Sequence, residues 1–152
     1  MVKYAVEEFR KVIEEAKPLL EEHWAEIAVY KDIPLDPDYE LYGKASDIGL
    51  LRVYTVRTED TNVLVGYAAF FVRPHAHYRG HKWALNDLVW VHPNFRRAHV
   101  GMGLVKFWDA DLKSIGVDVS HVNVKVAHPA LLYLLKNEGY DTVEAGLEKR
   151  LN

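Results

Sequence analysis

The chain has 152 residues, of which 49% are hydrophobic and 27% charged, and its net charge of −3 argues against a general affinity for nucleic acid or anionic membranes. The absence of cysteine excludes disulfides, thiol catalysis and thiolate metal sites, and it is typical of the reducing cytoplasm. With no signal-peptide pattern at the start and no apolar run near the roughly 18 residues of a membrane span, we expect one cytoplasmic domain over residues 1–152.

The chain should begin with a short strand and a long helix. Residues 2–6 read as the strand. From there to about residue 30, apolar side chains recur at helical spacing. Pro18 should kink or split this helix, because proline lacks an N–H and clashes with the preceding turn.

A second helix and three strands follow. The helix should begin with Asp36 as its N-cap and end at Gly43 or Gly49. After it the sequence becomes rich in β-branched and aromatic residues, and polar turns divide it into separate runs. The predicted strands are residues 50–56, 62–72 and 83–91.

The last third of the chain should alternate between helices and strands. Residues 100–115 place their apolar side chains on one side of a helix, which Gly116 ends. Residues 119–126 alternate as a strand, residues 129–139 form a further helix, and residues 141–151 read as a final strand. This order predicts an α/β sheet protein with an antiparallel meander and one β-α-β crossover near its end.

The stretch VHPNFRRAHVGMGLVKF, residues 91–107, joins a predicted strand to a predicted helix. Arg96 and Arg97 precede the turn, and Gly101 and Gly103 open the helix, so that a ligand could approach the backbone. The free amides of a first helical turn, with the helix dipole behind them, bind anions such as phosphate. An ordinary turn with solvated arginines explains the same residues, and the residues alone leave both readings open.

This stretch resembles the central motif of the GNAT superfamily of N-acetyltransferases, V-x-P-x-[YF]-R-x-x-G-x-G/A-x-x-L. VHPNFRRAHVGMGLV matches its spacing without a gap, except that His99 replaces the first glycine and would either crowd a pyrophosphate or contact it. The match is to the small single-domain type of bacteria and phages. It implies acetyl-CoA as co-substrate and a mixed, mostly antiparallel sheet flanked by helices, with a C-terminal β-α-β crossover.

By this resemblance, several groups would contact CoA. Arg96 and Arg97 would hold phosphate, and a bulge at about Leu88–Val89 would aim an amide at the thioester oxygen and stabilise the oxyanion. His128 stands where relatives often carry an asparagine that touches the pantetheine. The backbone of Val89 and Val91 would pair with the pantetheine like an added strand. The pyrophosphate would lie against the amides of Arg97, Ala98, His99, Val100, Gly101 and Met102.

The residues that would act as general acid and general base match the family pattern less well. In many relatives a tyrosine four residues before a Gly-aromatic pair protonates the leaving thiolate, but here that position is Leu135. Tyr133 is the remaining candidate acid, although it should project from another side of the helix, where packing is the simpler role. Asp87 lies where relatives often carry an acidic base, and Leu85 and Val89 would partly desolvate it. A salt bridge to a neighbouring strand is the alternative role for Asp87.

The segment RPHAHYRGHKW, residues 73–83, should join two strands beside the acceptor side of the cleft. His75, His77 and His81 have a spacing that zinc can use, but no carboxylate lies close by in the sequence. We therefore expect His75, His77 and Tyr78 to contact the acceptor, and we expect no bound metal. Four aromatic residues of the helical region should be mostly core, with one or two lining the site: Trp24, Tyr30, Tyr39 and Tyr42.

The leading hypothesis is an N-acetyltransferase that moves an acetyl group from acetyl-CoA to a primary amine by direct attack, with no nucleic-acid or membrane partner. Homodimers are common in this family and are compatible with the sequence. The alternative is a weak or inactive GNAT-fold binding module that grips a protein partner, which His99 and Leu135 favour. A metal-dependent enzyme built on the three histidines of residues 73–83 is the third reading.

Overall fold

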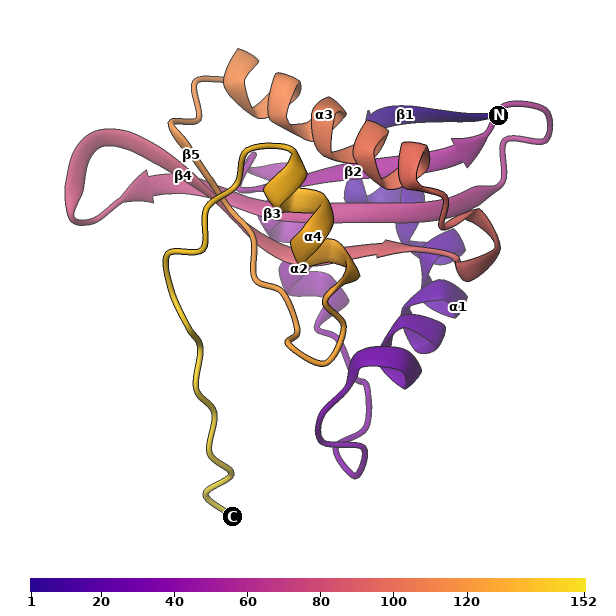
Figure 1. Ribbon diagram of the computed structural model, residues 1–152, viewed down its shortest axis with the longest axis horizontal. Helices are drawn as coiled ribbons and strands as arrows, with labels where there is room; N and C mark the ends of the chain where they lie inside the picture. The colour runs from indigo at the N-terminus through magenta and orange to yellow at the C-terminus, as the bar shows by residue number, and fades with distance from the viewer.

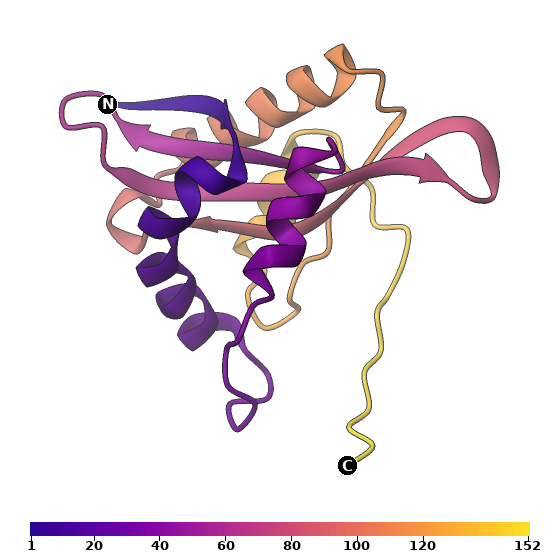
Figure 2. The same cartoon turned by 180° about the vertical axis from the view of Figure 1, so that it is seen from behind.

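The computed structural model describes the backbone of residues 1–152 and their side chains, except that of Ala98. It is a five-stranded sheet with α3 and α4 on one face and α1 and α2 on the other (Figures 1 and 2). The elements are β1 (Val2–Glu7), α1 (Phe9–Ile27), α2 (Tyr39–Asp47), β2 (Leu51–Thr58), β3 (Leu64–His75), β4 (Tyr78–Val91), the 3₁₀ turn η1 (Pro93–Phe95), α3 (Ala98–Ser114), β5 (Val119–His121) and α4 (Ala130–Asn137). The mixed α/β class with helices on both faces is confirmed.

The strands lie in the order β1-β2-β3-β4-β5. The first four are antiparallel neighbours, and β5 runs parallel to β4 after the crossover through α3. The predicted meander and β-α-β unit are therefore both correct. β5 pairs with β4 at only three positions, from Trp83↔Val119 to Leu85↔His121. Because the pairing is this short, β4 and β5 separate beyond Leu85.

The two faces of the sheet are packed differently. Under α3 and α4, the main core joins Tyr54 and Phe70 of the sheet to Trp108 and Leu104 of α3, all almost fully buried. Under α1 and α2 the buried side chains form two smaller clusters. One is centred on Val12 of α1, and the other consists of short side chains from the sheet and α2. The thinner packing on the second face leaves room for a cavity.

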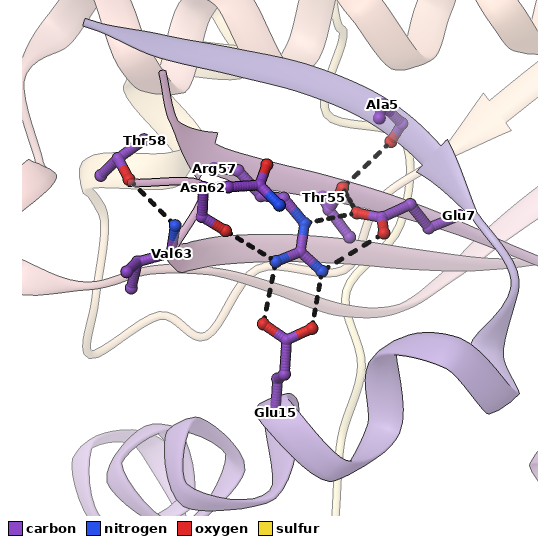
Figure 3. A network of polar contacts seen from close by, with 8 residues as sticks. All are labelled: Ala5, Glu7, Glu15, Thr55, Arg57, Thr58, Asn62 and Val63. Atoms are coloured by element: carbon purple, nitrogen blue, oxygen red, sulfur yellow. Dashed lines mark hydrogen bonds and ion pairs between the residues drawn. The ribbon is translucent and has the colours of Figure 1, made fainter. Parts of the chain in front are cut away.

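A buried arginine ties β1, β2 and α1 together. The guanidinium of Arg57, whose side chain is 8% exposed, pairs with Glu7 at 2.8 Å and with Glu15 at 2.9 Å and donates to the Asn62 carbonyl at 3.0 Å (Figure 3). Burial acts to raise the pKa of Glu7, but hydrogen bonds from Arg57 and Thr55 and the charge of Arg57 lower it on balance. The network fixes the end of β2 against α1.

Two local predictions in the first half of the chain are wrong. α1 runs through Pro18 as one helix, so the proline does not split it. The missing N–H removes one helical bond, and the buried Val12 and Ala16 on the preceding turns hold the helix against the sheet. The N-cap of α2 is Asp38, which accepts from the Leu41 N–H at 2.9 Å, rather than Asp36. No helix among the described residues is long and apolar enough to cross a membrane.

Two strand predictions in the last third also fail. β5 ends at His121 rather than at residue 126, because the chain then turns away from β4 and loses its partner. Residues 141–152 form no strand and run as an extended tail from α4 (Figure 1). The tail is rich in charge and contains Gly146, and its apolar Leu147 is 96% exposed, so it has no apolar face to pair with a sheet.

Candidate active site

β4 and β5 separate immediately after their last pair, Leu85↔His121. Beyond this point the Asn86 side-chain oxygen accepts a hydrogen bond from the Asn123 N–H and holds the first residues of the diverging segment. From Asp87 onward, β4 pairs with β3 on one edge only. A parallel pair that splays in this way exposes strand-edge N–H and C=O groups to which an extended ligand can hydrogen-bond.

The bulge in β4 lies at Asp87, one to two residues before the expected Leu88–Val89. Ala69 of β3 pairs with Leu88 and Phe70 with Asn86, so Asp87 is the extra residue. Its carboxylate accepts a hydrogen bond from the Tyr42 hydroxyl of α2 at 2.8 Å.

The environment of Asp87 also differs from the prediction. Because the bulge turns its side chain towards α2, Asp87 is exposed rather than partly desolvated between its strand neighbours. Burial, followed by the hydrogen bond to Asp87, raises the pKa of Tyr42, so the phenol stays a donor at neutral pH. The carboxylate is thus both oriented by a fixed donor and open to an incoming proton.

α3 begins without a side-chain cap. Arg97 is the N-cap residue in an extended conformation, and its carbonyl accepts from the amides of Val100 at 2.9 Å and Gly101 at 3.4 Å. The first N–H groups of a helix have no intrahelical acceptor, and the dipole makes this end positive. Arg97 and His99 are both exposed beside these amides, and the Met102 amide follows one turn further on. Residues 97–102 therefore lie together at the start of α3, with the exposed Arg97 guanidinium beside them.

Arg96, in contrast, turns towards α1. Its guanidinium forms a two-pronged ion pair with Glu26, with Nη1 2.7 Å from Oε1, and its Nε donates to the Val91 carbonyl at 2.7 Å. Trp90 donates to the same carboxylate at 3.0 Å. The hydrogen bonds from Arg96, opposed by burial and helped by Trp90, lower the pKa of Glu26 to about 2. This geometry anchors the β4–α3 loop to α1 and occupies the Val91 carbonyl expected to face pantetheine.

The two glycines of α3 serve packing rather than ligand approach. A Cβ on Gly101 would lie 3.3 Å from Leu134 of α4, and one on Gly103 would overlap the Tyr4 hydroxyl of β1. That hydroxyl donates to the Val100 carbonyl at 2.9 Å. The sequence suggested that both glycines make space for a phosphate. In the structure they instead allow α3 to pack closely against α4 and β1.

A cavity of about 510 Å³ lies between the sheet and the α1–α2 region. Leu88 and Ala69, the pair next to the bulge, belong to its lining, as does the Tyr42 side chain that bonds Asp87. All four aromatic residues of the helical region line it, more than the one or two expected: Trp24, Tyr30, Tyr39 and Tyr42. The cavity therefore adjoins the bulge on the face opposite α3.

The histidine segment lies at the tip of the β3–β4 hairpin, which projects beyond the rest of the sheet (Figures 1 and 2). The rings of His75, His77 and Tyr78 gather there with Trp83, with His75 and Trp83 centroids 4.4 Å apart. None of His75, His77 and Tyr78 belongs to the lining of the cavity as described. Within the described residues, no three histidine or carboxylate side chains are grouped to hold a metal ion.

The residues expected to act from the last helix and the turn before it differ in exposure. Leu135 is 3% exposed and is part of the main core, so the position of the usual tyrosine acid faces inward. Tyr133 is 64% exposed on the surface of α4, which excludes the packing role expected for it. His128 is exposed in the turn before α4, close enough for its charge to influence Glu26.

A splayed parallel pair, a bulged strand and an uncapped helix after that strand form a recognisable combination. Over residues 9–140 the sequence matches the model of the acetyltransferase (GNAT) family. The chain belongs to this family. A search of curated proteins found no significant match.

Solved GNAT structures share the whole fold. A ribosomal-protein-alanine N-acetyltransferase from Brucella melitensis biovar Abortus 2308 is 16% identical, with 100% of both chains covered and a TM-score of 0.75. An aminoglycoside acetyltransferase from an uncultured soil metagenomic sample, in complex with sisomicin, is 16% identical over 99% of this chain and 95% of that one, with a TM-score of 0.77. An acetyltransferase from Clostridium acetobutylicum with acetyl-CoA is 13% identical over 99% and 97%, with a TM-score of 0.72. At these identities the likeness shows a common fold.

Two contacts of this GNAT site were not foreseen from the sequence. The sequence did not indicate that Glu26 pairs with Arg96, because the two residues are 70 positions apart and no local pattern relates them. The pairing of Tyr42 with Asp87 depends on the bulge position, which a period-two pattern does not define. The apolar residues Ile33 and Leu35, unusual in a polar loop, are a further sequence signal of the cavity that they line, beside the aromatic residues already expected there.

Proposed function

We propose that this GNAT protein transfers an acetyl group from acetyl-CoA to a primary amine by direct attack. The observation that carries the proposal is the opening between β4 and β5, which has the uncapped start of α3 near one end and the Asp87 bulge at the other. The diphosphate would lie at the helix, and the thioester would reach the bulge. An amine in the cavity beside Leu88 would then meet the thioester.

The diphosphate contacts come from the first turn of α3. The first-turn amides within residues 97–102 are the proposed donors, because the helix dipole favours an anion at this end. The amides of Arg97, Val100 and Gly101 already donate to backbone carbonyls, so the His99 amide is the leading donor among these residues. Arg97 adds an exposed positive charge, whereas Arg96 supports the loop through Glu26. Val89 would pair with the pantetheine along the open strand edge, and the exposed His128 would face it from the turn before α4.

The chemistry at the bulge needs one proton acceptor and one donor to the oxyanion. The amine nitrogen attacks the thioester carbonyl carbon, the C–N bond forms, and the C–S bond breaks as the thiolate leaves. Asp87 takes the proton that the amine loses, directly or through water. A backbone N–H freed by the bulge stabilises the oxyanion, since Asp87 has no pairing partner in β3. With Leu135 in the core and Tyr133 on the outer surface, the departing thiolate takes its proton from water.

Release of free thiol from acetyl-CoA in the presence of a mixed panel of primary amines tests the proposal. We expect thiol release that depends on amine and saturates with acetyl-CoA. CoA binding by calorimetry without thiol release above background would instead identify a binding module. Loss of both would contradict the placement of the site itself.

A further inference from the structure

The cavity under α1 and α2 has a strongly apolar lining. Its walls are aromatic and aliphatic side chains, among them Trp24, Tyr39, Ile33, Leu35 and Leu88. Its volume of about 510 Å³ is within the range of small-molecule sites. A cavity of this kind binds an apolar group by removing its surface from water.

The polar groups of the lining are few, and two are already engaged. The Tyr67 hydroxyl is 3.0 Å from Nδ1 of the buried His23, and the Tyr42 hydroxyl donates to Asp87. A polyhydroxylated ligand would bury hydroxyl groups among apolar walls, and each one left unpaired weakens binding. Amino sugars are therefore poorly matched to this cavity.

The charged residues of the lining are exposed and carry a net negative charge. They are two carboxylates, Asp36 and Glu148, and one cation, Lys125. No arginine belongs to the lining as described, so a sugar phosphate would find no bidentate partner. A cationic amine is favoured by the two carboxylates as it enters, and the Asp87 carboxylate behind Tyr42 gives its nitrogen a partner.

We propose that the acceptor is an arylalkylamine, a primary amine on a short chain carrying an aromatic ring. The ring occupies the apolar cavity and the amine reaches the Asp87 bulge. This inference rests on the proposed function and names the substrate class of the same site. The cavity thus selects for the aromatic ring of the acceptor, whereas the Asp87 bulge binds its amine nitrogen.

Steady-state thiol release with matched amines tests the class. The aromatic probes are 2-phenylethylamine and tryptamine, and the polar ones are glucosamine, kanamycin and spermidine. We expect kcat/KM at least 100-fold higher for the aromatic probes. Comparable or better turnover of the polar amines, or of a peptide N-terminus, would overturn the inference while leaving acetyl transfer intact. No thiol release with any amine would count against the proposed function instead.

A cavity-filling variant separates binding in the cavity from general damage. Ala28 lines the cavity at the end of α1, whereas Ala25 is exposed on the same helix and is not among the lining residues. Ala28→Trp should raise KM for 2-phenylethylamine at least tenfold more than it raises KM for ethylamine, because ethylamine has no ring to accommodate. Ala25→Trp, the matched control, should change neither. Equal effects of Ala28→Trp on both amines, or no effect on either, would contradict the assignment of the ring to this cavity.

Discussion

Arg96 and Glu26, 70 residues apart in the sequence, form a two-pronged ion pair that ties the loop before α3 to α1. The same guanidinium donates to the Val91 carbonyl, so three of its nitrogens are engaged. The residue at the motif arginine position therefore holds the loop before α3 in place through α1. Its neighbour Arg97 is the cation left at the surface of the loop.

Because Arg96 is paired with Glu26 and Arg97 is exposed, charge changes at the two positions should affect CoA binding in different ways. Arg97→Glu should weaken CoA binding at least tenfold, about 1.4 kcal/mol, because it places a negative charge beside the diphosphate. Raising the salt concentration should reduce this effect, since exposed charges are screened. Calorimetry with CoA measures both, and an unchanged affinity would contradict the proposed diphosphate position.

Arg96→Glu should also weaken CoA binding, but through the loop. Glutamate at this position would face Glu26, and the loop would lose its anchor on α1. The charge swap that combines Arg96→Glu with Glu26→Arg should recover most of the lost affinity, because it rebuilds an ion pair at the same place. If the swap binds CoA as weakly as Arg96→Glu alone, Arg96 contacts the phosphate directly and the anchoring role is wrong.

His23 should make stability depend on pH. Burial lowers the pKa of His23 to about 4, opposed by the charge of Glu26 and reinforced by that of Arg96. In the unfolded chain histidine titrates near 6.5, so between these values the unfolded state binds the additional proton. The free energy of unfolding should therefore fall as the pH decreases from about 6.5 to about 4, by up to about 1.4 kcal/mol per pH unit.

Urea unfolding of the wild type and of His23→Gln across this range isolates the effect. Glutamine retains a polar partner for Tyr67 but does not titrate, so the variant should lack this part of the pH dependence. His99→Gln, at an exposed position, is the control and should follow the wild type. Parallel pH profiles for all three proteins would show that His23 does not titrate as its burial implies.

Local sequence patterns predicted the parts of the fold whose signals lie within one element. The helix predicted over residues 100–115 is observed as α3, Ala98–Ser114, because its apolar spacing and the Gly116 that follows it lie within one continuous segment. The failures involve partners that are distant in sequence. Residues 122–126 alternate like a strand but do not pair with β4, because the chain turns away from β4 after His121. Gly103 is explained only by Tyr4, a contact between the first strand and the third helix.

The buried ion pairs of Arg57 give a stability prediction. Arg57→Met should lower the free energy of unfolding by about 3 kcal/mol, because Glu7 loses its charge partner at a position that is only 25% exposed. Arg79→Met at an exposed position of the hairpin should change it by less than about 0.5 kcal/mol. Adding Glu7→Gln to Arg57→Met should restore part of the loss in urea titrations. A loss below about 1 kcal/mol for Arg57→Met would mean that the attraction between these charges barely exceeds the cost of removing them from water.

The final prediction concerns Asp87 and Tyr42 in catalysis. Asp87→Asn should lower kcat by about 10²–10⁴, the usual contribution of a general base, and leave CoA affinity unchanged. Tyr42→Phe should lower kcat by a smaller factor, because it removes the hydroxyl that orients the carboxylate and leaves the carboxylate in place.

The basicity of the amine distinguishes a proton acceptor from a structural role. A weakly basic amine such as 2,2,2-trifluoroethylamine is already neutral at pH 7, and its nitrogen releases its proton to water more readily as it attacks, so that it depends less on a protein base. The deficit of Asp87→Asn should therefore shrink with this amine relative to ethylamine, in parallel thiol-release assays at saturating acetyl-CoA. A deficit of the same size with both amines would mean that Asp87 supports the bulge rather than accepting the proton. The pairing with Tyr42 would then serve to hold the strand in its splayed form.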